Sequence, residues 1–112
     1  MDRTQKKYLK DIENAIHEID CFFNKWPKQF NIFCEELVLR RAIERNIGII
    51  GEAVNKLLKL DRDIKITQVR NIIATRNRVI HAYDSLKPDL IWAIVINDLP
   101  VLKSEVEAML SE

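Results

Sequence analysis

Four side chains whose chemistry suits catalysis fall within eight residues of this 112-residue chain. They are Arg76, Asn77, His81 and Tyr83, in the segment Arg-Asn-Arg-Val-Ile-His-Ala-Tyr. On a helix, Asn77 and His81 are four residues apart and share a face, and the long Arg76 side chain can reach around toward the imidazole. The segment can therefore present a guanidinium, an imidazole, an amide and a phenol within one small area.

These groups suit cleavage of an RNA phosphodiester without a metal. RNA supplies its own nucleophile, the 2′-hydroxyl, so a catalyst needs a proton-transfer group near neutral pH and a cation for the transition-state charge. Histidine is the first kind of group, and the planar fork of arginine is the second. We expect Arg76 and His81 to be catalytic, with Asn77 orienting the imidazole or donating to phosphate. The alternative is structural, with His81 capping a helix end and Arg76 and Tyr83 as surface groups.

Charge is distributed unevenly along the sequence. The stretch from Arg62 to Arg78 carries a net charge of +4 and the stretch from Asp84 onward −4, although the whole chain carries only +1. A basic segment can bind an anion locally. We therefore expect Arg70 and Arg78 to contact RNA, the alternative being that both stretches are solvated helix faces.

The sequence offers little that would bind a metal. Asp84 and Glu52 are isolated carboxylates, and Cys21 and Cys34 lack the spacing and the histidine pair of a zinc site. We expect no metal and no cofactor. Cysteines on apolar faces are more often reduced core thiols, with a disulfide between the two as the alternative.

The elements that must position these residues are predicted to be helices. The chain has only two Gly and three Pro, and its apolar residues recur at steps of three and four. Pro100 is expected to kink the last helix or to start a new segment. Helices are expected over residues 4–24, 31–60 and 68–82, from Pro88 onward, and over 101–110. The expected fold is all-α, an up-down bundle of four to five helices forming a single domain over residues 1–112.

Local features refine this prediction. Asn31 is expected to cap the second helix, whose apolar stripe includes Leu37, and Thr67 is expected to cap the third. Gly48 and Gly51 lie inside the second helix, where glycine costs about 1 kcal/mol relative to alanine. The simplest compensation is the close approach of another helix, and a dimer interface is a second use.

Three segments carry a resemblance to a known family. The pattern Arg76-x4-His81-x-Tyr83 resembles the signature of the HEPN ribonuclease superfamily. Residues 45–53 (RNIGIIGEA) resemble the second helix of its HepT-type branch, and residues 91–102 (IWAIVINDLPVL) resemble the closing helices. The chain departs from many relatives at residues 67–69 (TQV), where those relatives carry an aromatic residue early in the third helix.

The resemblance implies a HEPN-like homodimer whose motif residues face each other across a cleft. It implies a toxin of a prokaryotic toxin–antitoxin pair, with RNA as substrate and an MntA-type nucleotidyltransferase as antitoxin. Arg76 and His81 match the catalytic pair, and Asn77 matches the polar residue after the arginine. Tyr83 matches the tyrosine to which the antitoxin adds AMP units.

Two further expectations concern the molecule as a whole. A one-histidine site lacks separate acid and base groups, and a symmetric dimer would supply a second histidine. No signal peptide or membrane-length apolar run is evident, so we expect a cytoplasmic protein. The competing hypothesis is a non-catalytic helical partner, or nucleotide-binding module, of a nucleotidyltransferase.

Overall fold

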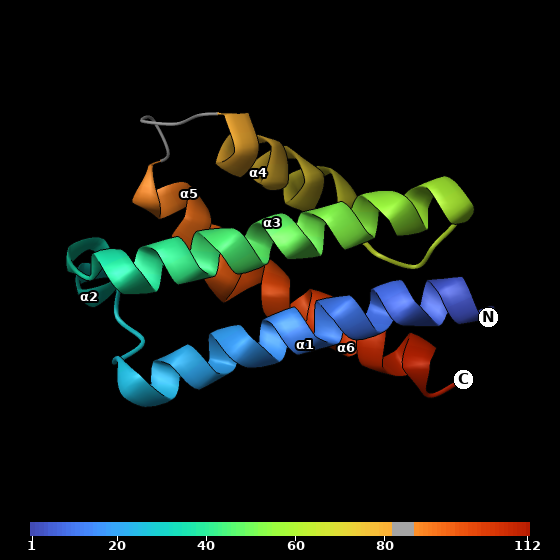
Figure 1. Ribbon diagram of the computed structural model, residues 1–112, viewed down its shortest axis with the longest axis horizontal. Coiled ribbons are helices and arrows are strands. Elements are labelled where there is room, and N and C mark those ends of the chain that lie inside the picture. The colour runs from blue at the N-terminus through green and yellow to red at the C-terminus, as the bar shows by residue number, and fades with distance from the viewer. Residues whose placement is uncertain (82–86) are drawn as a thin grey trace.

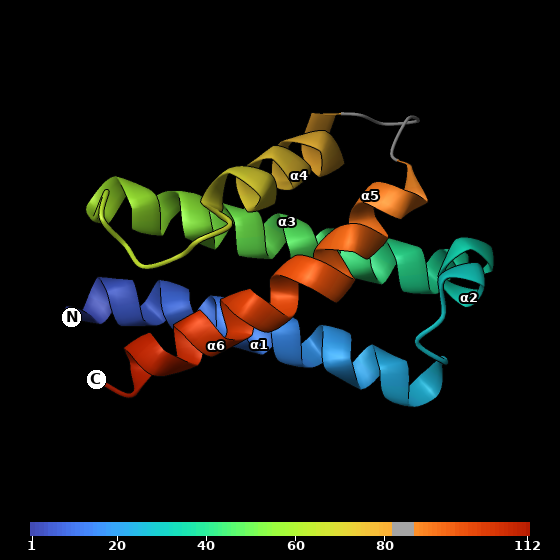
Figure 2. The ribbon, with the colours of Figure 1, turned by 180° about the vertical axis from the view of Figure 1, so that it is seen from behind.

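A computed structural model describes the backbone of residues 1–81 and 87–112, and the side chains of residues 1–77 and 87–112. Within these ranges every regular element is a helix, which confirms the predicted all-α bundle. The helices are α1 (Arg3–Lys25), α2 (Phe30–Glu35), α3 (Leu37–Leu60), α4 (Val69–His81), α5 (Pro88–Ala93), the π-helix η1 (Ile94–Asp98) and α6 (Leu99–Leu110). Figure 1 shows α1 and α3 side by side, with α4 packed along α3. Seen from behind in Figure 2, α5, η1 and α6 follow one another across α1 and α3.

The first helix follows its apolar pattern closely. It begins one residue earlier than expected because Asp2 and Gln5 form a capping box, in which each side chain accepts from the other residue's backbone N–H. Its buried face is Leu9, Ile12, Ala15, Ile16 and Ile19. The buried Asn46 of α3 ties this face to α3, since its Nδ2 donates to the Ala15 carbonyl (3.2 Å) and to Glu18 Oε1 (3.1 Å).

The single long helix expected over residues 31–60 is wrong, because the chain breaks at Glu36. The backbone of Glu36 is extended, with φ −92° and ψ 94°, and it separates α2 from α3. Arg40 Nη1 donates to the Cys34 carbonyl (2.8 Å), which satisfies one of the acceptors that the end of α2 leaves open. The break is therefore held by a side chain of the following helix.

The break lets α2 fold against α5 through an aromatic cluster. Trp92 of α5 is the centre, with ring centroids 5.3 Å from Phe33, 6.0 Å from Phe30 and 6.0 Å from Phe23. Such pairs add about 0.5–1.5 kcal/mol each beyond the area that they bury. Packing between distant segments thus outweighs the local tendency of residues 31–60 to stay one helix.

Three predicted details change with the helix boundaries. Asn31 lies inside α2, and Gln29 takes the N-cap position instead. Leu37, expected on the buried stripe, is 52% exposed because the helical phase restarts after Glu36. The expected cap Thr67 is also displaced by one residue, since α4 begins at Val69 and its first intrahelical acceptor is the Gln68 carbonyl.

The last helices behave as expected around their prolines. Pro88 occupies the first turn of α5, where its missing N–H costs nothing. Pro100 lies in the first turn of α6, directly after the π-helical turn η1, so a new segment does start there. Asp98 closes this turn and is largely buried, and burial raises the pKa of its carboxyl.

Both cysteines are free thiols, and His17 lies near one of them. Cys21 and Cys34 are both free, so no disulfide joins them, but Cys21 is exposed and is not the core thiol that we expected. His17 is exposed on α1, with its Nε2 3.6 Å from Cys21 Sγ. None of the described helices combines the length and apolarity needed to cross a membrane.

Candidate functional site

The site is built on the contact between α3 and α4, in which the two helices approach closely at Gly51. A Cβ atom placed on Gly51 would overlap Arg76 Cβ, and it would lie 2.7 Å from Arg76 Cγ and 3.2 Å from the Ile72 carbonyl oxygen. No side chain larger than hydrogen fits there without moving a helix. The expected reason for glycine inside the second helix, close approach of another helix, is confirmed at Gly51.

This contact holds the Arg76 side chain against α3. Its Nη2 forms an ion pair with the Glu52 carboxylate, and its Nη1 donates to Asn77 Oδ1 (2.7 Å). The Arg76 side chain is only 21% exposed, whereas that of Glu52 is 44% exposed. The guanidinium is therefore held by two oxygen acceptors, one from each helix, and the side chain is mostly buried.

Counting donors shows what Arg76 can still bind. A guanidinium has five N–H groups, and the bonds to Glu52 and Asn77 use one on each terminal nitrogen. The Nε–H is buried and has no partner among the described residues. Among the described residues, one N–H on each terminal nitrogen then has no partner, and such arginine N–H groups can donate to phosphate oxygens. Arg76 can therefore bind an anion while Glu52 and Asn77 fix its position.

The structure describes the side chains of some of the other predicted site residues and not of others. Asn77 is exposed on α4, and the structure brings its amide oxygen to Arg76. Arg70 is exposed on the same helix, six residues before Arg76. The helical backbone runs on to His81, but the side chains of Arg78 and His81 lie outside the described ones. Tyr83 lies outside the described residues altogether.

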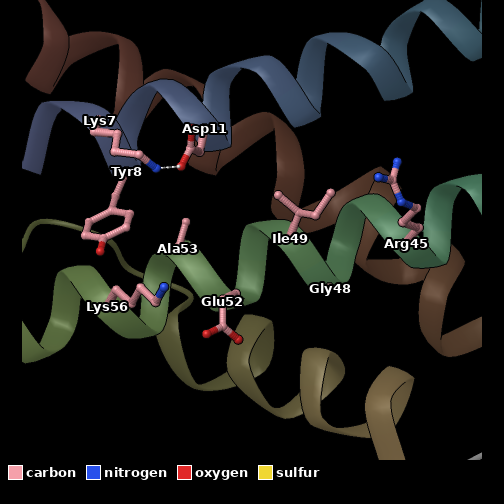
Figure 3. A pocket seen from close by; sticks show the side chains of 9 residues that line it. All are labelled: Lys7, Tyr8, Asp11, Arg45, Gly48, Ile49, Glu52, Ala53 and Lys56. Atoms are coloured by element: carbon pink, nitrogen blue, oxygen red, sulfur yellow. Dashed lines mark hydrogen bonds and ion pairs between the residues drawn. The ribbon is translucent and has the colours of Figure 1, made fainter. Parts of the chain in front are cut away.

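A surface groove of about 470 Å³ adjoins this contact, between α1 and α3. Figure 3 shows it with Lys7 and Tyr8 on one side and Glu52 on the other. Lys7 pairs with Asp11 (2.9 Å), and the hydrogen bond and charge of that carboxylate raise the pKa of the lysine. The complete lining is Lys7, Tyr8, Asp11, Arg45, Gly48, Ile49, Glu52, Ala53 and Lys56.

The ion pair of Glu52 with Arg76 was not predicted, because Glu52 is an isolated carboxylate in the sequence. The ion pair joins residues 24 positions apart, and helical periodicity says nothing about such a contact. One signal was available: Glu52 directly follows the glycine at which another helix was expected to approach. Among the described residues, no three His, Cys, Asp or Glu side chains come together in a way that could hold a metal ion.

Comparison with known proteins gives a consistent result over nearly the whole chain. A family model described as "Ribonuclease HepT-like" matches residues 7–109. The protein named "Putative RNase TTE0752" from Caldanaerobacter subterraneus subsp. tengcongensis is 34% identical over 98% of this chain and 97% of its own length. "Probable ribonuclease HepT" from Thermococcus cleftensis is 32% identical over 97% of this chain and 98% of its own. "Putative RNase MJ1380" from Methanocaldococcus jannaschii is 32% identical over 94% and 95%. No solved structure matches the chain closely enough for comparison.

Gly51→Ala tests the helix contact on which the site depends. The added methyl group raises helix propensity by about 1 kcal/mol, but overpacking against the Arg76 stem and the Ile72 carbonyl costs about 1–3 kcal/mol. We expect a net loss of stability, measured as a lower urea midpoint of unfolding. An unchanged or higher midpoint would show that the helices do not meet closely at this residue.

Proposed function

The chain belongs to the HepT-like ribonuclease family, and we propose that it is a metal-independent endoribonuclease that acts as the toxin of a prokaryotic toxin–antitoxin pair. The observation that carries this proposal is the seating of Arg76. Its guanidinium is held at the α3–α4 contact, on the helix that also contains His81, and one N–H on each terminal nitrogen has no partner among the described residues. We further propose that residues 1–112 form one HEPN-like domain, which works on RNA in the cytoplasm.

In the proposed reaction the RNA 2′-hydroxyl attacks the adjacent phosphorus, and the bond to the 5′-oxygen of the next nucleotide breaks. A histidine imidazole accepts the proton of the 2′-hydroxyl, and an imidazolium delivers a proton to the leaving oxygen. Arg76 stabilises the charge that develops on the non-bridging oxygens. The first product is a 2′,3′-cyclic phosphate. Asn77 supports the site by accepting from Arg76, while Arg70 and Arg78 are proposed to hold the flanking RNA backbone.

A second copy of the chain would complete this chemistry. The motif contains one histidine, and one imidazole cannot act as base and acid in the same step. If two α4 helices meet at a two-fold axis, Arg76 and His81 of both copies line one cleft. We therefore propose that the active form is a homodimer.

The proposed regulation acts through Tyr83. An MntA-type nucleotidyltransferase would transfer AMP units to the phenol oxygen, which follows His81 by two residues. Each unit adds a bulky anionic phosphodiester beside the proposed RNA site. Added volume and like-charge repulsion would then keep RNA out.

RNA cleavage in the presence of EDTA tests the proposed chemistry. We expect the wild-type protein to cleave RNA under these conditions and His81→Ala to lose about 10²–10⁴-fold in rate, since that is the usual contribution of a proton-transfer group. His17→Ala is the matched control, because His17 is the chain's other histidine and lies exposed on α1. It should cleave like the wild type, and both variants should keep the wild-type far-ultraviolet circular dichroism.

Two outcomes would reject this chemistry. If EDTA abolishes cleavage, a metal takes part in the reaction. If His81→Ala cleaves normally, its imidazole transfers no proton. A wild-type protein that never cleaves RNA would favour the competing hypothesis, in which the chain is a non-catalytic partner of a nucleotidyltransferase.

Light scattering tests the dimer. The monomer mass is 13.2 kDa, and we expect a mass of about twice that at micromolar concentration, because a single copy has one motif histidine. Only the monomer mass over this range would contradict the proposal that two copies form the site.

Tyr83→Phe tests the modification. Coexpressed with its nucleotidyltransferase, the wild-type chain should gain mass in whole AMP units, and Tyr83→Phe should gain none because the acceptor oxygen is absent. The variant should stay toxic, since the ring is kept and a phenol with a pKa near 10 is a poor base at pH 7. Tyr8→Phe is the control, as Tyr8 is the other tyrosine. Intact-mass spectrometry that finds AMP units on Tyr83→Phe would place the acceptor elsewhere.

A further inference from the structure

Glu52 stands between the surface groove and the arginine of the site. It follows Gly51 in α3, and it lines the groove together with Ile49 and Ala53. Its carboxylate does not point across the groove to α1. In Figure 3 it turns away from α1 and toward α4, whereas Ile49 and Ala53 point toward α1. The acidic group is thus directed at the helix that carries Arg76.

The contacts of Arg76 show what this direction achieves. Glu52 accepts from one terminal nitrogen and Asn77 from the other, so both arms of the guanidinium fork are held by protein oxygens. Arginine has a long side chain with many rotamers. With Asn77 as the single acceptor, just one terminal nitrogen of the guanidinium would be held. With the stem packed on Gly51 and two acceptors on the fork, the plane of the guanidinium is fixed.

The charge of Glu52 also argues for this role and against direct contact with RNA. A carboxylate beside a phosphate raises the energy of the complex unless a cation lies between them. Arg76 is that cation, because it pairs with Glu52 and has, on each terminal nitrogen, one N–H without a partner among the described residues. An anion that binds here would therefore be expected to contact the guanidinium and not the Glu52 carboxylate.

We propose that Glu52 is a positioning residue of the ribonuclease site, one that sets the plane of the Arg76 guanidinium so that its two remaining N–H groups meet the phosphate in the transition state. The inference rests on the proposed ribonuclease activity and adds a residue to it. Glu52 makes no contact with RNA and transfers no proton in this role, so its effect is transmitted through Arg76 alone.

Steady-state cleavage of a defined oligoribonucleotide tests this role. Glu52→Gln keeps the shape of the side chain and removes its charge. We expect kcat to fall about tenfold with KM within about twofold, because orientation acts on the transition state more than on binding. Glu52→Ala should lose on the order of 10²-fold in kcat. Glu52→Asp, which keeps the charge on a shorter stem, should lie between wild type and Glu52→Ala.

Asp11→Asn is the matched control. Asp11 is another partly exposed carboxylate of the same groove, and it pairs with Lys7 instead of the site arginine. It should leave kcat and KM at wild-type values. Thermal unfolding of each variant shows that the assays use folded protein.

A double-mutant comparison then asks whether Glu52 acts through Arg76. In an Arg76→Lys background the fork is absent, so adding Glu52→Gln should change kcat by less than about twofold. A full tenfold loss in that background would overturn the inference.

Three other results would also overturn it. The first is an unchanged kcat in folded Glu52→Gln. The second is a change in KM alone, which would make Glu52 an RNA-binding group, and the third is a rise in activity, which would mean that the carboxylate competes with the phosphate. A wild-type protein without any cleavage would remove the proposed function as well. Cleavage by the wild type with an unaffected Glu52→Gln variant would remove only the role of Glu52.

Discussion

The close contact between α3 and α4 at Gly51 is the constraint on which the candidate site depends. With no side chain at residue 51, the stem of Arg76 lies directly on the backbone of α3, and the Ile72 carbonyl lies one turn away. The next residue along α3 is Glu52, so the same approach that seats the stem also brings a carboxylate to the guanidinium. One missing methyl group thus couples helix packing to the placement of the charge that would face RNA.

The rest of the fold keeps α3 in position for this contact. On one side α3 is packed along α1, with a buried stripe and the Asn46 hydrogen bonds between them. Fully burying a leucine or isoleucine contributes about 1.5–3 kcal/mol, and the stripe contains several: Leu39, Ile43, Ile47, Ile50 and Leu57. At the other side Ile72 of α4 is buried against the same core. Movement of α4 along α3 would therefore disturb apolar packing as well as the ion pair between Arg76 and Glu52.

Much of the fold could be predicted from periodicity, and the parts that could not have a common cause. Residues 4–24 and 68–82 repeat their apolar positions regularly, and the observed helices match them within one or two residues. The break at Glu36 was not predicted because it serves the aromatic cluster around Trp92, whose members come from three helices. The same holds for the site. The residue types of Arg76 and His81 suggested their chemistry, and the glycine suggested a helix contact. The pairing of Arg76 with Glu52 is tertiary, and only the folded chain reveals it. The roles assigned to His81 and Tyr83 remain predictions, since their side chains lie outside the described ones.

The identity of the nucleophile tests the central claim most directly. An oligoribonucleotide with one preferred cleavage site would be compared with the same oligonucleotide carrying a 2′-O-methyl group on the nucleotide that supplies the nucleophile. If the 2′-hydroxyl attacks, mass spectrometry should find a 2′,3′-cyclic phosphate or its opened product from the unmodified RNA, and no cleavage at that bond in the methylated RNA. Cleavage of the methylated bond would mean that water or a metal-bound hydroxide attacks, and it would contradict the proposed attack by the 2′-hydroxyl with Arg76 and His81 as catalytic groups.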